Sequence, residues 1–212
     1  LYFSKHLHIL LAFPNTYFAN LNPQGQLDNL ESVTKEVKLM MDPNADPFAA
    51  ALVDENAVPG KFGASDIQDL NWVQLLNAYT CTECGRCTSS CPANITGKKL
   101  SPRKIMMDTR DRMEEVGRNI DANKGVFIPD NKTLLNDYIT AEELWACTSC
   151  NACVEECPVN ISPLSIIMDM RRYLVMEQSA APMPINAMMS NIETNGAPWH
   201  YNQPDRLTWK NE

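Results

Sequence analysis

The chain has 212 residues, enough for one or two domains with a hydrophobic core, and its composition of 44% apolar and 21% charged residues is ordinary for a folded soluble protein. Its formal net charge of −8 argues against a nucleic-acid surface, which needs basic patches. No run of 18 apolar residues exists, so no complete transmembrane helix is predicted.

Residues 1–20 are unusual for the start of a soluble protein. They are rich in aromatic side chains, contain no acid and carry Lys5 as their only fixed charge. We interpret them as the end of a membrane helix, with the aromatic rings and Lys5 at the level of the lipid headgroups. The alternative is a segment buried against the cysteine-bearing part of the chain.

Residues 21–64 are predicted to be a connector. They open on the turn-rich sequence LNPQGQLDN and end in a loop that contains Pro59 and Gly60. Between these turns, residues 30–41 have the pattern of a short amphipathic helix.

The first run of cysteines is preceded by a predicted helix. It begins at Asp66 after the N-cap Ser65 and continues to about Tyr79, which delivers the chain to Cys81. The second run is preceded by a capping box over residues 140–143, TAEE, which starts another helix.

The segments that follow the two runs also match each other. The sequence SPRKIMMDTR (101–110) corresponds to SPLSIIMDMR (162–171). In each, serine would cap a helix whose first residue is proline, where the missing N–H has no cost. We expect helices of about 14–16 residues, the first ending near Gly117 and the second before Pro182.

Residues 65–180 therefore contain an internal duplication of helix, cysteine loop and helix. No convincing strand pattern appears anywhere, so we predict an all-α core. An exposed loop over residues 121–132 and a short helix over residues 134–139 are expected between the two copies. Residues 181–212 are predicted to be a C-terminal tail that contacts a partner.

The eight cysteines of the chain all lie in two runs of identical spacing, C-x2-C-x2-C-x3-C-P. This spacing is the bacterial ferredoxin pattern for [4Fe-4S] clusters, in which the fourth cysteine binds the other cluster. We predict two [4Fe-4S] clusters, the first held by Cys81, Cys84, Cys87 and Cys157 and the second by Cys147, Cys150, Cys153 and Cys91.

Two residues inside the first loop invite a specific interpretation. Gly85 is expected to let the backbone approach the cluster where a side chain would collide. Arg86 would raise the potential of that cluster or recognise an acidic partner, and the alternative is a solvated loop arginine.

Other chemistry for the cysteines fits less well. Cysteines three residues apart are poorly placed to form disulfides with each other, and no extracellular context is visible. Zinc sites use two separated C-x2-C pairs rather than four cysteines in a row. No position of either quartet is substituted, which argues against a [3Fe-4S] cluster.

The long separation of Cys91 from Cys147 resembles the α-helical ferredoxin domain found in three groups of proteins. These are the iron–sulfur subunits of succinate dehydrogenase, the C subunit of anaerobic glycerol-3-phosphate dehydrogenase, and the C and D subunits of heterodisulfide reductase. The resemblance covers about residues 65–180. It implies two pseudo-repeated cluster-binding units in one helical domain.

The N-terminal residues YFSKHLHILLAFPNTYF resemble the last membrane helix of a cytochrome b domain like that of the nitrate reductase gamma subunit. In that family an element F-[ST]-[KR]-x-x-H carries a haem b ligand, and here the matching histidine is His8. The resemblance thus implies haem b at His8, with His6 as a rival and an interfacial histidine without haem as the alternative.

The tail NGAPWHYNQPDRLTW (195–209) resembles the segment that follows the clusters in heterodisulfide-reductase-like oxidoreductases. In many of those, cysteine-rich CCG domains follow, and this chain has no ninth cysteine. The resemblance therefore implies a membrane-bound iron–sulfur oxidoreductase subunit whose catalytic partner is another chain, a CCG-domain protein or an electron-transfer flavoprotein.

From these features we expect an electron-transfer subunit at the cytoplasmic face of the cell membrane. It would relay electrons through both clusters between a flavoprotein or CCG partner and haem b or menaquinone. The alternatives are an iron–sulfur subunit of a soluble disulfide reductase or dehydrogenase complex, a chain that itself reduces a disulfide, and a structural iron–sulfur or zinc module without a redox cycle.

Overall fold

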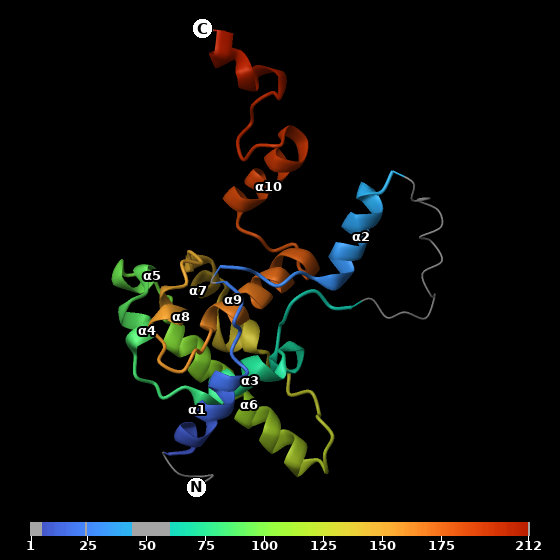
Figure 1. Cartoon of the computed structure of the whole chain (residues 1–212). Helices are drawn as coiled ribbons and strands as arrows, with labels where there is room; N and C mark the ends of the chain where they lie inside the picture. Colours follow the sequence, from blue (N-terminus) through green and yellow to red (C-terminus); the bar gives the residue numbers. More distant parts are fainter. Residues whose placement is uncertain (1–5, 24, 44–59, 212) are drawn as a thin grey trace. The chain divides into compact units, whose positions relative to one another are not determined.

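Helices make up the secondary structure in this computed structural model, which describes residues 6–23, 25–43 and 60–211 (Figure 1). No strand occurs among those residues, so the predicted all-α class is confirmed. The chain divides into two compact units, residues 1–173 and residues 174–212.

The N-terminal helix α1 (Leu7–Tyr17) packs against α3 (Trp72–Thr80). The side chain of Asn15 is buried and its Nδ2 donates a hydrogen bond to the carbonyl of Val159, 2.8 Å away. The ring of Phe18 meets that of Trp72 edge-on, with centroids 4.8 Å apart. The described part of residues 1–20 is therefore packed on the cysteine-bearing core, and among the helices described none has the length and apolarity needed to cross a membrane.

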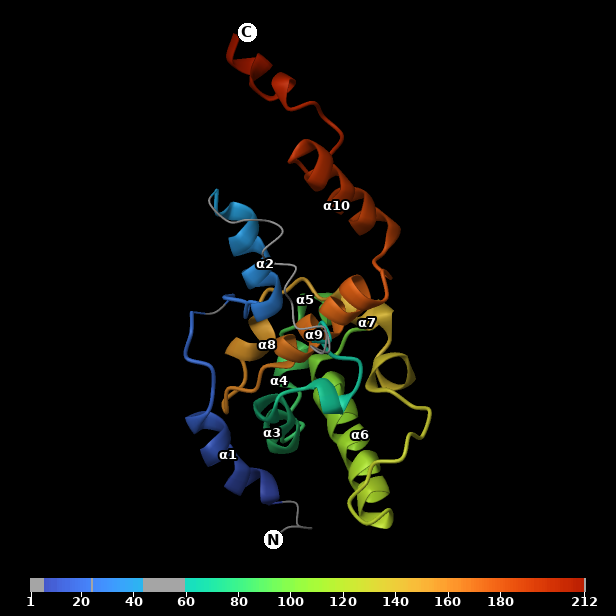
Figure 2. The same cartoon turned by 90° about the vertical axis from the view of Figure 1, so that its right-hand side faces the viewer.

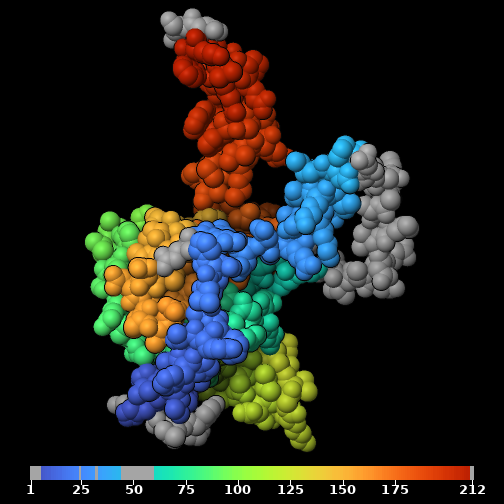
Figure 3. Space-filling model, in the orientation of Figure 1, coloured from blue at the N-terminus to red at the C-terminus, as the bar shows by residue number. Residues whose placement is uncertain are grey.

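The connector contains the predicted short helix, α2 (Glu31–Met41). Before it, residues 18–23 and 25–28 cross the surface beside α8 (Ala152–Glu155) and α9 (Pro163–Arg172), as Figure 3 shows. The predicted loop around Pro59 lies largely outside the described residues.

The helix predicted from Asp66 to Tyr79 is wrong in one respect, because the structure breaks it in two. A 3₁₀ turn (Ile67–Asp69) is capped by Asp66 rather than by Ser65, and α3 begins after a new cap, Asn71. The Asn71 side chain accepts a hydrogen bond from the backbone N–H of Gln74, and the Gln74 side chain in turn accepts one from the Asn71 N–H. This capping box starts a separate helix.

The helices that follow the cysteine loops begin as predicted. Ser101 caps α6 (Pro102–Ala122) and Ser162 caps α9, each with proline in the first turn. The capping box at Thr140 likewise starts α7 (Ala141–Ala146). Two short helices, α4 (Arg86–Ser89) and α5 (Pro92–Ile95), complete the first repeat.

Two of the remaining helix predictions are wrong, and one is confirmed. Helix α6 passes Gly117 and ends at Ala122, because the first left-handed residues, Lys124 and Gly125, come only after it; the Gly125 N–H reaches the carbonyl of Ile120. The second helix ends before Pro182 as predicted, because α9 continues beyond Arg172 as a π-helical turn (Tyr173–Glu177). The helix predicted over residues 134–139 is an irregular turn (Leu134–Tyr138), since Asn136 has a φ of +78°.

The long helix α6 forms the centre of the first unit and packs against both α3 and α9 (Figure 2). Its buried residues meet those of the second repeat in one apolar core. The side chains with 1% exposure or less include Ile105, Met106, Leu144, Ile166, Ile167 and Met170. The two repeats therefore share a core rather than forming separate domains.

The second unit contains α10 (Met183–Asn195) and a 3₁₀ segment (Pro204–Asn211). Gly196, with a φ of +64°, ends α10. Many large apolar side chains of the second unit are exposed, including Met183, Ile192, Trp199, Leu207 and Trp209. The prediction that residues 181–212 contact a partner stays a prediction.

Candidate metal centre

The two cysteine loops have the same backbone form. In the first, Glu83 and Gly85 are left-handed, with φ of +58° and +80°; in the second, the equivalent Ser149 and Asn151 have φ of +55° and +61°. Left-handed residues within such loops turn successive N–H groups inward to make concavities typical of anion and iron–sulfur sites.

The shared backbone form changes the role expected for Gly85. A β-carbon there would come no closer than 4.0 Å to another protein atom, so crowding by the protein does not require glycine. The positive φ does favour it, and Asn151 meets the same demand in the second loop, since asparagine tolerates this region better than most residues.

A small cavity of about 50 Å³ collects the first predicted set of cysteines. The thiols that line it come from the first loop and from the end of the second: Cys81, Cys84, Cys87, Cys153 and Cys157. Burial raises the pKa of the Cys87 thiol, and repulsion from Cys81, Cys157 and Cys84 raises it further. The structure thus brings Cys157 to the first loop.

The second predicted set is brought together in the same way. Burial raises the pKa of the Cys147 thiol, and Cys91 and Cys150 add to the rise. Cys91 belongs to the first loop in sequence and is buried. Each loop therefore sends its fourth cysteine to the other loop.

Cys153 lies where the two sets approach each other. Burial raises the pKa of its thiol to about 12, and the charged neighbours that contribute are, in order, Cys147 and Cys87, followed by Cys150 and Cys91. Helices α4 and α8, which carry Cys87 and Cys153, pack together. Cys87 and Cys153 thus connect the two sets through packed helices.

Backbone donors reach several sulfur atoms. The Ser149 N–H donates to Cys147 Sγ over 3.4 Å, and the Ile161 N–H to Cys157 Sγ over 3.3 Å. Hydrogen bonds of this kind to thiolate sulfur raise the reduction potential of an iron–sulfur cluster.

One arginine stands beside each loop at the same position of the duplication. Arg110 of α6 pairs with Glu83 and contributes to the electrostatics of Cys81. Arg171 of α9 donates instead to the carbonyls of Leu144 and Cys147. Sequence reasoning missed both residues, although the aligned segments 101–110 and 162–171 each end in arginine.

The donor set fits iron–sulfur clusters. All eight cysteines are free, and the buried ones are crowded by other thiols. Bringing such groups together as thiolates requires positive charge at the centre, which iron supplies. Within the described residues, no group of three or more His, Cys, Asp and Glu side chains lies close enough together to hold a single metal ion. A zinc site would need sulfur atoms about 3.8 Å apart.

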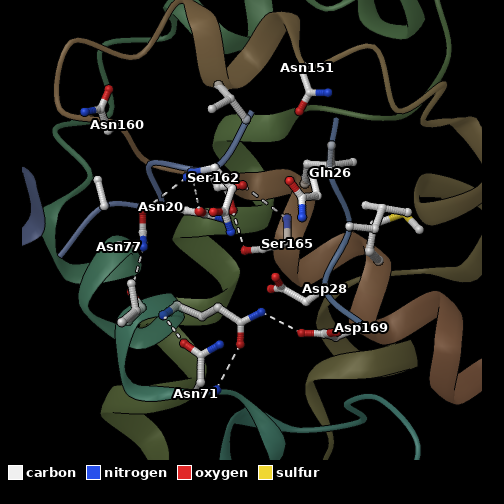
Figure 4. Close-up of a pocket in the computed structure, with 18 of the residues that line it drawn as sticks. Asn20, Gln26, Asp28, Asn71, Asn77, Asn151, Asn160, Ser162, Ser165 and Asp169 are labelled. Carbon is white, nitrogen blue, oxygen red and sulfur yellow. Dashed lines mark hydrogen bonds between the residues drawn. The ribbon is translucent and has the colours of Figure 1, made fainter. Parts of the chain in front are cut away.

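A larger cavity of about 620 Å³ lies between residues 18–23 and 25–28 on one side and α3 and α9 on the other (Figure 4). Its polar side chains are largely engaged with one another. Gln74 Nε2 donates to Asp169 over 2.7 Å, and Asn77 accepts from the Ser162 N–H over 3.1 Å. We interpret these hydrogen bonds as the polar contact that holds α3 against α9.

The other predicted site residue, His8, lies in α1 with its side chain partly exposed. Among the described residues, no contact joins His8 to any of the cysteines. Haem b at His8 is not supported and stays a prediction of the resemblance.

Residues 80–161 match the family described as 4Fe-4S dicluster domain. The helical core is a 4Fe-4S dicluster, ferredoxin-like domain. The matched residues contain both cysteine runs. Flanking helices that pack around them, such as α9, lie outside the match.

Relatives extend the similarity beyond the dicluster domain. The chain is 31% identical, over 99% of its length, to a probable iron–sulfur-binding oxidoreductase FadF of Bacillus subtilis, and 32% identical, over 79%, to the EtfAB:quinone oxidoreductase of Syntrophomonas wolfei. It covers 30% and 26% of those proteins.

A third relative comes from a methanogen. The chain is 33% identical, over 50% of its length and 52% of the relative, to the C subunit of a ferredoxin/F420H2-dependent CoB–CoM heterodisulfide reductase of Methanosarcina acetivorans. The homologues are thus iron–sulfur oxidoreductases and their subunits.

Proposed function

We propose that the chain is a one-electron relay with two [4Fe-4S] clusters in an oxidoreductase complex. Cys81, Cys84, Cys87 and Cys157 would hold one cluster, and Cys147, Cys150, Cys153 and Cys91 the other. The observation that carries the proposal is the exchange of the fourth cysteines, which supports two four-thiolate sites in one core.

The clusters would supply reversible one-electron chemistry, and the chain's own residues would position and tune them. The loops supply inward N–H groups, and Arg171 supplies unpaired positive charge close to Cys147, whereas Arg110, close to Cys81, is paired with Glu83. The packed pair α4 and α8 would keep the separation between the two sites fixed, so that electrons pass between them without motion of the chain.

The complex we propose is membrane-associated. A flavoprotein or CCG-domain partner would deliver electrons, which would pass on to menaquinone at the cytoplasmic face of the cell membrane. The name of the Syntrophomonas relative, which includes both a flavoprotein and quinone, supports this partnership. Haem b at His8 would be an intermediate station, tested by replacing His8 with alanine and looking for loss of haem absorption in isolated membranes.

A second candidate is the iron–sulfur subunit of a soluble reductase complex of the heterodisulfide type. The Methanosarcina relative, named as part of a heterodisulfide reductase, favours it, since the chain covers about half of that protein. Purification from separated membrane and soluble fractions, with identification of the co-purifying chains, distinguishes the two candidates.

The relay itself is tested on anaerobically prepared protein. We expect about eight iron atoms and about eight acid-labile sulfides per chain, and reduced EPR signals from two clusters that interact. Zinc in place of iron, or clusters that cannot be reduced and reoxidised, would contradict the proposal.

A further inference from the structure

The two cysteine loops differ in charge, although they are copies of one unit. The first repeat carries Arg86 and Arg103 where the second carries Ala152 and Leu164. The two repeats share their cysteines, helix caps and prolines. Because they differ at these two positions, they present two different surfaces. The difference therefore bears on what approaches each cluster from outside.

Arg86 and Arg103 converge on the first loop from different helices. Arg86 opens α4 directly after Gly85, and Arg103 lies in the first turn of α6. The backbone N–H of Arg103 donates to Thr88 Oγ1 over 3.2 Å, and its Nη1 lies 4.0 Å from the place of a β-carbon on Gly85. Both arginines are exposed and line the cavity of the first cysteine set.

Neither guanidinium has an ion-pair partner in the part of the chain that the structure describes. Arg110, close by, is neutralised by Glu83. Glu156 lines the same cavity as Arg86 and Arg103, so the charged side chains there, apart from the cysteines, carry one positive charge in excess. In a chain with a net charge of −8, this is a local reversal of sign.

Cys84 lies at this surface and is itself exposed. An exposed ligand is the edge of a cluster that a partner reaches first. Cys150, its counterpart in the second loop, is also exposed, but its neighbours Ser149, Asn151 and Ala152 carry no charge. Only the first of the two exposed edges offers unpaired arginines among the described residues.

We infer that the surface formed by Cys84, Gly85, Arg86 and Arg103, here called the Cys84 face, docks an acidic surface of a one-electron carrier protein. This inference rests on the proposed relay and names its entry or exit face. One electron passes between carrier and cluster, and no atom is transferred. A basic face on an acidic protein orients an acidic carrier and repels it elsewhere, which raises the association rate and selects the first cluster.

The test is the second-order rate constant for electron transfer from a reduced acidic flavodoxin to the chain with both clusters assembled, followed by stopped-flow absorbance. In the double variant Arg86→Gln/Arg103→Gln we expect this rate constant to fall about tenfold at low ionic strength. The difference should vanish near 1 M salt, where the Debye length is about 3 Å.

A control removes the same number of positive charges from the far end of α6 and the turn that follows it. The double variant Arg118→Gln/Lys124→Gln should react with flavodoxin like the wild type, since Arg118 lies far along the helix from the cysteines and is highly exposed. With the methyl viologen radical cation as reductant, the Arg86/Arg103 variant should react at least as fast as the wild type. A general loss of structure would slow both reductants.

An unchanged flavodoxin rate in the Arg86/Arg103 variant, or an equal loss in the control, would overturn the inference. If the double variant assembles fewer clusters, the single variants at the same two exposed positions take its place. Dithionite separates this failure from that of the relay: clusters that dithionite reduces normally leave the relay intact, whereas clusters that it cannot reduce in wild-type protein refute the relay itself.

Discussion

The guanidinium of Arg171 lies over the ring of Trp145, with its central carbon 5.0 Å from the ring centre. Two of its nitrogens donate to the carbonyl of Leu144, over 3.0 and 2.6 Å, and one of them also to the carbonyl of Cys147. No carboxylate pairs with it among the described residues. Its positive charge therefore acts on the cluster site at Cys147 without neutralisation.

Replacing Arg171 with glutamine should lower the reduction potential of the cluster at Cys147. The reduced cluster carries one more negative charge, which the guanidinium stabilises. Arg171→Lys should keep most of the potential, because it keeps the charge. The measurement is a redox titration followed by EPR.

The matched control is the double variant Glu83→Gln/Arg110→Gln, which removes a neutral pair at the equivalent position of the first repeat. It should shift the reduction potential of the cluster at Cys81 by less than Arg171→Gln shifts that of the cluster at Cys147. Equal shifts would show that the unpaired charge of Arg171 has no special effect.

Gly63 is predicted to be the least replaceable glycine of the first unit. A β-carbon there would lie 2.1 Å from the carbonyl oxygen of Asp169, and the φ is +73°. The Asp169 carbonyl also accepts the N–H of Ala64 over 3.0 Å, which holds the segment before the first loop against α9. Gly63→Ala must therefore both strain the backbone and separate these segments.

Gly97 separates the two effects, since its φ is +81° and a β-carbon there would meet no atom within 4 Å. Gly97→Ala should cost only the strain of about 1–2 kcal/mol. Gly63→Ala should lower Tm by clearly more, at about 2–4 °C per kcal/mol for a chain of this size. Equal Tm values for the two variants would mean that the backbone at Gly63 moves aside.

Arg112 of α6 is a fully buried charged residue of the first unit, with a side chain that is 0% exposed. It donates to Asp66 and Asp130 and to the carbonyl of Lys132. Its guanidinium lowers the pKa of Asp130 to about 2. Arg112 thus ties the start of the first repeat and the loop after α6 to one helix.

Arg112→Ala should destabilise the protein by up to about 3 kcal/mol, the low end for a broken buried pair, because it leaves the partly buried carboxylates of Asp66 and Asp130 without their partner. Arg112→Lys should recover only part of this loss, since lysine lacks the planar fork. Arg118→Ala, at an exposed pair with Glu114, should cost no more than about 1 kcal/mol. Thermal or denaturant unfolding of the three variants decides, and a similar cost for Arg112→Ala and Arg118→Ala would be inconsistent with this role.

Local signals predicted much of the fold. The caps Ser101, Thr140 and Ser162 were recognisable because a side chain three residues before its partner N–H needs no tertiary information. The duplication and the ligand spacing were visible for the same reason, since both are properties of short stretches.

Long-range contacts explain what the sequence did not reveal. Asp66 caps a 3₁₀ turn while it also binds Arg112, which is 46 residues away in the chain, and no local pattern announces that pair. Asn15 likewise meets Val159 across most of the chain, which places α1 on the core. The charge difference around Cys84 became meaningful only when Arg103 was found beside Gly85.

The exchange of fourth cysteines is the central claim, and paired substitutions test it directly by iron analysis and EPR. In Cys84→Ala/Cys157→Ala, both losses should fall on one cluster, leaving the other intact with about four iron atoms and an EPR signal without a neighbour. In Cys150→Ala/Cys157→Ala, each cluster should lose one ligand, so neither keeps four cysteines. The reverse result, an intact cluster in the second variant and none in the first, would contradict the crossed arrangement.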